Sequence, residues 1–392
     1  MTYPATSETT HAGWRNAFGQ YRNVLAIVLS LTLLQGAAAA LSVMIALSLA
    51  KAGASNAALG LVAAFFAGGF LTGALLSPPQ IARIGHIRSF SFFAAIAIIA
   101  SLSFTLGVSI LGWAIVQGVI GITTAALLTA GESWIADAAP AEKRGSILGF
   151  YHVIAKLGAM AGPFLIKGAA GGITGFIVVA VLFAATIMPI TATRQSQPEI
   201  STSTPMGPRK IFRLAPAAAI AAFTAGAVNN SVAQLYPVFA QTVSPTAAAG
   251  FAANFNAAVL AGAMVGLWPA GMISDRIDRR LVIAATGLLG GVCALALGLL
   301  AVTASPVIIL ILAFGYGAGA LSFYAVAVAP AADKVSASRA TPMMAGILVL
   351  WGIGSIVGPI LSGFVMTPLG GPGLFFFTAA ALALLAALMF TR

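Results

Sequence analysis

The sequence predicts an all-α integral membrane protein, with 12 transmembrane helices arranged in two six-helix bundles. Three observations predict it: 60% of the 392 residues are hydrophobic, only 7% are charged, and long apolar runs recur along almost the whole chain. A soluble protein carries about a quarter charged residues, so this chain lacks the side chains needed for a water-facing surface. The composition therefore excludes a soluble enzyme, a nucleic-acid-binding protein and a disordered chain.

The apolar runs match the length of membrane-spanning helices, because about 20 helical residues cross a hydrocarbon core about 30 Å thick. Their continuity indicates helices rather than the alternating strands of a transmembrane barrel. The polar residues 1–23 show no removable signal peptide. The expected spans are, in order, Val24–Ala50, Ala57–Ser77, Ser89–Leu111, Gly112–Ile135, Gly145–Gly168, Gly172–Ala192, Leu214–Gln241, Ala248–Ile273, Leu281–Val302, Pro306–Ala329, Pro342–Met366 and Gly371–Phe390.

The basic residues gather on one side of the predicted membrane. Of the 19 Lys and Arg residues, 16 fall in segments on the same side as both termini. Only Lys51 and Lys167 lie at the opposite ends of the spans, and Lys156 lies inside one. By the positive-inside rule, we expect both termini in the cytoplasm and the protein in the cytoplasmic (inner) membrane. The net charge of +11 is then a topology signal, and no nucleic acid is expected as a partner.

A long polar segment, residues 193–213, is rich in Pro, Ser and Thr and divides the spans six and six. We expect it to be a cytoplasmic linker. The predicted organisation is then a cytoplasmic tail over 1–23, an N-terminal six-helix bundle over 24–192 and a C-terminal six-helix bundle over 214–392.

A motif of small residues returns at the same place in both sets of spans. Residues 158–163 in the fifth span and 354–359 in the eleventh share the pattern Gly-xxx-Gly-Pro, 196 residues apart. That distance is half the chain, which indicates duplication of a six-span unit. Tandem units of this kind place a substrate path at their interface.

Several motifs resemble those of the major facilitator superfamily (MFS) of transporters. Residues 271–280, a Gly followed by Asp-Arg and a basic cluster, are similar to the family's loop motif. Residues 137–145 resemble its loop between spans 4 and 5, and 158–163 resemble a motif of its antiporters. Residues 132–134 and 84–88 together are similar to an efflux-like bacterial branch. The resemblance covers nearly the whole chain.

This resemblance implies the MFS fold and a secondary transporter that works by alternating access, with spans 1, 4, 7 and 10 lining the cavity. The sequence departs from the family pattern at three positions. Ala82 replaces an Asp of the first loop motif, Ala114 replaces the usual Arg of span 4, and Lys167 lies where a further glycine pair is expected. These departures weaken the transfer of a proton-coupled drug antiport mechanism.

Glu132 is the only acid expected inside a span, where a charge costs several kcal/mol and needs a reason. His152 starts from the other side of the same loop at a similar depth, so we expect the two side chains to be neighbours. A His–carboxylate pair that titrates near neutrality would couple transport to a proton or another ion. The alternative is a static hydrogen-bonded pair that tethers spans 4 and 5.

Lys156 lies near the middle of the fifth span, one turn after His152 and on the same helix face. A Lys at this depth can hold its charge for an anion. We expect it to face the cavity and contact an anionic or carboxylate-bearing substrate. The alternative is that Lys156 snorkels to the interface or pairs with polar groups only to hold helices together.

Polar uncharged side chains near the middle of spans are further candidates for substrate binding, because an amide both donates and accepts hydrogen bonds. The alternative is interhelical hydrogen bonding without substrate contact. The candidates are Gln35, Asn229, Asn230, Ser231 and Gln234, with Asn254, Asn256, Tyr316 and Tyr324 as weaker ones.

Charged residues of the loops are candidates for gating. Asp275 can pair with Arg276, Arg279 or Arg280, and such pairs would hold the cytoplasmic side shut until the halves rock. Asp137 or Glu132 can partner Arg83 in the first half, and Arg144 belongs to the same set of loop charges. The alternative for these arginines is plain anchoring by the positive-inside rule.

The predicted function is secondary active transport of a small organic solute by alternating access, as ion- or proton-coupled export with a preference for anions. The alternatives are a multidrug exporter of neutral or hydrophobic compounds and, in a different class, a non-transporting membrane receptor or scaffold. We expect no enzymatic activity, no cofactor and no metal site. The expected partners are the solute, the coupling proton or ion and the lipid bilayer, and the expected state is a monomer.

Overall fold

The computed structural model describes residues 8–107, 109–139, 143–192, 205–328 and 335–390, and no strand occurs among them. The all-α prediction is confirmed. The first half contains α1 (Glu8–Lys51), α2 (Asn56–Ile84), α3 (His86–Ser103), the short 3-10 helix η1 (Phe104–Leu106), α4 (Ile110–Ala138), α5 (Arg144–Ile166), α6 (Ile173–Ala185) and α7 (Ile187–Thr191).

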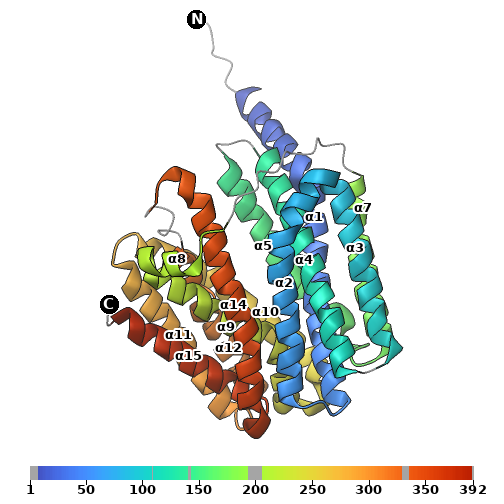
Figure 1. Ribbon diagram of the computed structural model, residues 1–392, viewed down its shortest axis with the longest axis vertical. Coiled ribbons are helices and arrows are strands. Elements are labelled where there is room, and N and C mark those ends of the chain that lie inside the picture. The colour runs from blue at the N-terminus through green and yellow to red at the C-terminus, as the bar shows by residue number, and fades with distance from the viewer. Residues whose placement is uncertain (1–7, 108, 140–142, 193–204, 329–334, 391–392) are drawn as a thin grey trace, which may run out of the picture.

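The second half repeats this arrangement after a short helix. It contains α8 (Pro208–Leu214), α9 (Pro216–Val243), the 3-10 helix η3 (Pro245–Ala247), α10 (Ala248–Ser274), α11 (Arg279–Leu300), α12 (Pro306–Ala320), α13 (Phe323–Val328), α14 (Ala337–Leu369) and α15 (Gly373–Phe390). Figure 1 shows the first half on the right and the second on the left.

In the described part of the chain, 11 segments are long and apolar enough to cross a membrane. The remaining predicted span coincides with α9, which has 28 residues and is therefore long enough. It falls short in apolar character because Asn229, Asn230, Ser231 and Gln234 lie along it. A helix with this many polar groups is better placed inside a bundle than against lipid.

Consecutive membrane-spanning segments run in opposite directions, so the loops between them lie at two ends of the molecule. We call the end that carries Arg83, Arg144 and the loop between α10 and α11 the basic face. The opposite end is the far face, where α1 ends at Lys51 and α10 begins at Ala248. The basic face is at the top of Figure 1.

The predicted end of the third span was wrong because the apolar run continues through a turn. The third span was expected to reach Leu111, but α3 and η1 end at Leu106 and Gly107 turns the chain with a φ of 131°. Ser109 then caps α4 by accepting from the N–H of Gly112. The sixth span is interrupted at Thr186, and the tenth at Leu321 and Ser322.

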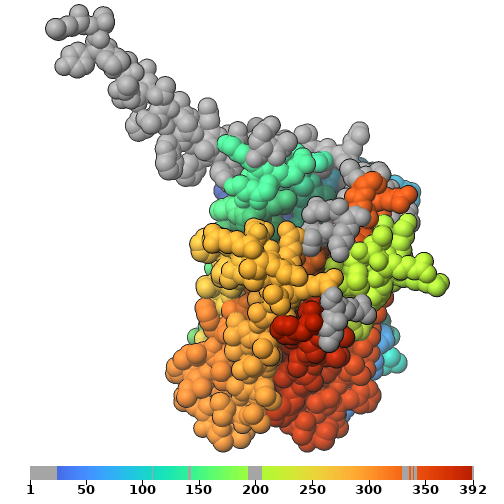
Figure 2. All heavy atoms as spheres, turned by 90° about the vertical axis from the view of Figure 1, so that its left-hand side faces the viewer, coloured from blue at the N-terminus to red at the C-terminus, as the bar shows by residue number. Residues whose placement is uncertain are grey.

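The predicted linker contains a helix of its own, since α8 lies within residues 193–213 except for its last residue. Pro208 occupies its first turn, a position that Pro favours. Ile211 is fully buried against the second half, and Figure 2 shows α8 at the surface of the molecule. Residues 193–204 and 1–7, parts of the predicted linker and tail, lie outside the described residues.

The internal repeat of the sequence corresponds to a repeat in packing. In the first half, Gly158 and Gly162 of α5 pack on α1, so closely that a Cβ at Gly162 would overlap the carbonyl oxygen of Gly36. In the second half, Gly358 of α14 packs in the same way on Ala227 of α9. The repeated glycines thus serve the same helix pair in each half, the first and fifth spans.

A second pair of helices is matched across the halves. Gly69 of α2 lies against the backbone of Gly118 in α4, and Gly262 of α10 lies against the backbone of Phe314 in α12. Both contacts leave no room for a Cβ, so in each half the second and fourth spans approach at glycines.

The two halves meet along three helices of the first half and three of the second. α2 packs along α14 for much of its length, α5 packs on α10, and α1 packs on α9. The pairing of α2 with α14 is visible at the centre of Figure 1. Any path for a solute between the halves is therefore bordered by α1, α5, α9 and α10.

Candidate functional site

Among the residues that the structure describes, three side-chain hydrogen bonds connect the halves, and all three lie on the far-face side of the molecule. The Ser42 hydroxyl of α1 donates to the carbonyl of Ala233 in α9 at 2.7 Å. The Asn56 amide of α2 donates to the carbonyl of Met366 in α14 at 2.8 Å. Because both acceptors are backbone groups, these bonds hold the helices themselves together.

The third bond joins the remaining helix pair. The Asn256 amide of α10 donates to the carbonyl of Ala159 in α5 at 2.9 Å. Around Asn56, α2 and α14 also approach so closely that a Cβ at Gly60 would overlap the carbonyl oxygen of Pro359. These contacts close the space between the halves on the far-face side.

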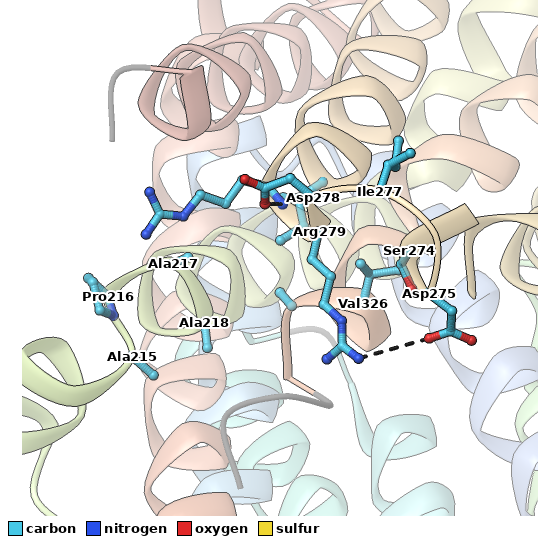
Figure 3. A pocket seen from close by; sticks show the side chains of 13 residues that line it. Ala215, Pro216, Ala217, Ala218, Ser274, Asp275, Ile277, Asp278, Arg279 and Val326 are labelled. Carbon is cyan, nitrogen blue, oxygen red and sulfur yellow. Dashed lines mark hydrogen bonds and ion pairs between the residues drawn. The ribbon is translucent and has the colours of Figure 1, made fainter. Parts of the chain in front are cut away.

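The gating candidates at the basic face do not form a matching closure in this structure. Arg279 approaches Asp275 at 3.9 Å, but the two residues are four apart in the same loop and start of helix (Figure 3). Asp278 caps α11 by accepting from the N–H of Arg280. The ion pair and the cap therefore shape this loop without connecting it to the first half.

The other gating candidates are separate and mostly exposed. Arg83, Asp137, Arg144 and Arg276 are exposed, and none of them makes an ion pair with a described residue. The predicted pairing of Arg83 with Asp137 or Glu132 is thus not formed here. A cavity of about 450 Å³ opens beside the loop, between the starts of α9 and α11 and the end of α13 (Figure 3).

Lys156 lies on the face of α5 that is directed toward the second half. His152, Lys156 and Ala159 follow one another at intervals of four and three residues, which places them on one helix face. The carbonyl of Ala159 accepts the bond from Asn256, so this face meets α10. Lys156 is partly buried, and its ammonium has no hydrogen bond or ion pair with any described residue.

Gln35 is on the matching face of α1. It precedes Ser42 by seven residues, or two helical turns, and Ser42 contacts α9. Gln35 therefore faces the second half, about 10 Å nearer the basic face than the Ser42 bond. It is partly exposed and makes no hydrogen bond with a described residue.

The structure separates the polar candidates of α9. Asn229 borders a cavity of about 60 Å³ between α9, α10 and α12, together with Asn256 and Tyr316. Asn230 instead donates to the carbonyl of Ser355 in α14 at 2.9 Å, which is the interhelical alternative. Gln234 follows Asn229 by five residues and so projects from another side of α9.

Glu132 is bound by a tyrosine rather than by the predicted histidine. The Tyr151 hydroxyl of α5 donates to Oε1 of Glu132 in α4 at 2.8 Å. The His152 ring is exposed and packs beside the Tyr151 ring with centroids 4.7 Å apart. Tyr151 thus lies between the two groups, and no bond joins His152 directly to Glu132 among the described residues.

A family model described as Major Facilitator Superfamily matches residues 27–319 and 245–392, which together cover most of the chain. The chain belongs to the major facilitator superfamily. An uncharacterized MFS-type transporter of Enterobacter sp. (strain 638) is 27% identical over 382 residues, covering 95% of this chain and 96% of that protein. The predicted resemblance is thereby confirmed.

Solved structures of MFS-type architecture agree with the fold. The nucleoside transporter NupG matches with a TM-score of 0.78 and 12% identity over 94% of this chain and 98% of that chain. A bacterial homolog of the human lysosomal transporter Spinster, inward-facing and unoccupied, matches with a TM-score of 0.69 and 17% identity, covering 95% and 94%. At these identities the match shows the fold alone. Family and fold together make this chain a multi-pass membrane protein and a secondary transporter.

The three hydrogen bonds that join the halves of this MFS protein were not predicted from the sequence. In the sequence, Ser42 is a single hydroxyl within a span and Asn56 lies at the start of a helix. Asn256 was predicted only as a weaker candidate for substrate binding. No common sequence signal marks them, since Leu41 and Val43 flank Ser42 whereas Phe255 and Ala257 flank Asn256. His86 was also missed as a partner: its Nε2 lies 3.1 Å from Oγ of Ser133, which joins α3 to α4.

Nowhere among the described residues do three His, Cys, Asp or Glu side chains gather. The polar side chains at the interface between the halves are one ammonium, that of Lys156, and several amides. Such groups can bind a solute by charge and hydrogen bonds.

Proposed function

We propose that this transporter exports a small anionic organic solute, which binds at Lys156 between the two halves. The supporting observation is that Lys156 is partly buried on the α5 face directed toward the second half and has no described partner for its charge. A buried ammonium without a counter-charge is costly, and an anionic solute would supply that charge. Gln35 and Asn229 would add amide contacts from α1 and α9.

The proposal assigns the basic face to the cytoplasm, with both termini there, by the positive-inside rule. The three bonds on the far-face side would then close the path toward the outside. Lys156, Gln35 and Asn229 all lie on the basic-face side of those bonds and would be reached from the cytoplasm. Export as the direction rests on the resemblance of residues 132–134 and 84–88 to the efflux-like branch.

Lys156→Ala is expected to reduce anion transport about 10- to 100-fold, because a hydrogen bond to a charged group contributes about 1.5–3 kcal/mol. Lys156→Arg keeps the charge and should retain a measurable part of the rate. The measurement is uptake into proteoliposomes from a panel of monocarboxylates, dicarboxylates and inorganic phosphate. Lys210→Ala, an exposed lysine of α8, is the control. Wild-type rates for the Lys156→Ala protein would contradict the proposed site.

We propose further that Glu132 and His152 couple transport to a proton, with Tyr151 connecting them. The Glu132→Gln, His152→Gln double variant should transport at a rate that no longer depends on an imposed pH gradient. Lys210→Ala is again the control, because Lys210 is exposed and lies on α8, outside the helices that carry this pair. Proteoliposome transport with and without the gradient measures the effect, and an unchanged dependence in the double variant would rule out this coupling.

A neutral or hydrophobic solute is the second candidate. It is favoured by the aromatic side chains beside Asn229, which are Tyr236, Phe255 and Tyr316 and would border a solute once the cavity of about 60 Å³ between them widens. Aromatic rings of this kind bind apolar solutes without a charge. The same uptake assay separates the two candidates, since a neutral solute would still be transported by the Lys156→Ala protein.

A further inference from the structure

Lys51 and Lys167 break the charge pattern of the chain, since they are the two basic residues at the far-face ends of the spans. Both border a single open cavity of about 590 Å³. Lys51 is the last residue of α1 and Lys167 directly follows α5. We call this cavity the far-face vestibule.

The vestibule lies between the halves, directly outside the closing contacts. Its first-half wall runs from Leu47 to Lys51 and from Lys167 to Gly171, and its second-half wall consists of Gln241 and residues 245–250. Leu47 is little more than one turn from Ser42, whose bond to Ala233 closes the path. A solute that leaves the site at Lys156 through an opened closure would therefore enter the vestibule.

The side chain of Lys51 extends along the loop that begins at Lys167. A Cβ built on Gly171 would lie 3.7 Å from Cδ of Lys51, so the lysine stem passes over this loop. Gly171 has a φ of 77°, a conformation that favours glycine and leaves that space open. Lys51 and Lys167 thus belong to the same wall of one cavity.

The charge of the vestibule is not balanced locally. The described acids after α1, which are Glu132, Asp137, Asp275 and Asp278, all lie toward the basic face. Neither lysine makes an ion pair with a described residue. The opposite wall adds the Thr246 hydroxyl, the Gln241 amide and the first N–H groups of α10, which also favour an anion.

We infer that Lys51 and Lys167 form a second anion-binding site, for a carboxylate- or phosphate-bearing solute, at the far-face end of the transport path. The inference rests on the proposed anionic substrate and adds its outer binding station. Two exposed ammonium groups each contribute modestly, so the site would bind weakly and release readily. That suits a site from which an exported solute departs.

The first test uses transport measured from each side of proteoliposomes, with the anion of the panel that wild type transports fastest. Lys51→Gln, Lys167→Gln is expected to raise KM from the far face about tenfold and to leave KM from the basic face unchanged. The effect should be the same in vesicles of phosphatidylcholine alone and with added phosphatidylglycerol. An effect confined to phosphatidylglycerol vesicles would identify a lipid headgroup as the occupant and overturn the inference.

The second test is independent of transport. In the detergent-solubilised full chain, succinate and inorganic phosphate should protect Lys51 and Lys167 from an amine-acetylating reagent, read by mass spectrometry, while Lys210 stays reactive. Protection should persist in Lys156→Ala. If Lys51 and Lys167 are not protected, the inference is overturned but the proposed function is not. Normal transport by Lys156→Ala would instead contradict the proposed function.

Discussion

Replacing Gly60 with Ala is expected to abolish transport and to hold the protein open at the far face. A Cβ at this position would overlap the carbonyl oxygen of Pro359 in α14, and Gly363 leaves no room to shift, since its Cα would be 3.2 Å away. Overpacking against backbone costs about 1–3 kcal/mol. A penalty of about 3 kcal/mol on the closed state alone changes the ratio of closed to open forms about a hundredfold.

The change of state can be read with a cysteine at Gln35, in a Cys293→Ala background. Gln35 lies on the basic-face side of the Ser42 bond, so a membrane-impermeant maleimide added at the far face reaches it only when the closure opens. Labelling from that side should be slow in the parent protein and fast with Gly60→Ala. Transport of the preferred anion should fall in parallel in the variant that keeps Gln35.

Gly68→Ala is the matched control on the same helix. A Cβ there would lie 4.0 Å from Cδ1 of Ile356, which is ordinary van der Waals contact. Removing a helical glycine without a clash stabilises by about 0.5–1 kcal/mol. The control should therefore transport normally, and equal behaviour of Gly60→Ala and Gly68→Ala would contradict the assigned role of the α2–α14 contact.

The sequence was sufficient for the features that depend on composition and repetition. The scarcity of charge predicted the membrane, and the repeated Gly-xxx-Gly pattern at 158 and 354 predicted the duplication, whose glycines lie at close helix contacts in both halves. A small residue is needed wherever two backbones touch, so its position is informative without any knowledge of the partner.

Features that depend on helix rotation could not be predicted in this way. Tyr151 and His152 are neighbours in sequence but project about 100° apart, and only the rotation of α5 decides which reaches Glu132. Lipid and protein interior are both apolar, so hydropathy does not fix that rotation. The same holds for the Asn256 bond to Ala159, which depends on how the two halves dock.

The glycines of the repeated motif are expected to stabilise both halves to a similar degree. Gly162→Ala would overlap the carbonyl oxygen of Gly36, and Gly358→Ala would overlap that of Ala227. We expect each variant to lose about 2 kcal/mol, after the intrinsic gain of a helical alanine. For a chain of this size that corresponds to a fall in Tm of about 2 °C, measured by thermal unfolding in detergent.

Gly149→Ala provides the control, because a Cβ there meets nothing within 4 Å. The double variant Gly162→Ala, Gly358→Ala then tests whether the halves are separate bundles. The two sites share no contact partner, so their destabilisations should add if each half responds independently. If the double variant is no less stable than either single variant, the two halves do not respond independently. One half would then limit the stability of the whole protein, and the other half would contribute to that stability through the interface of α2 with α14.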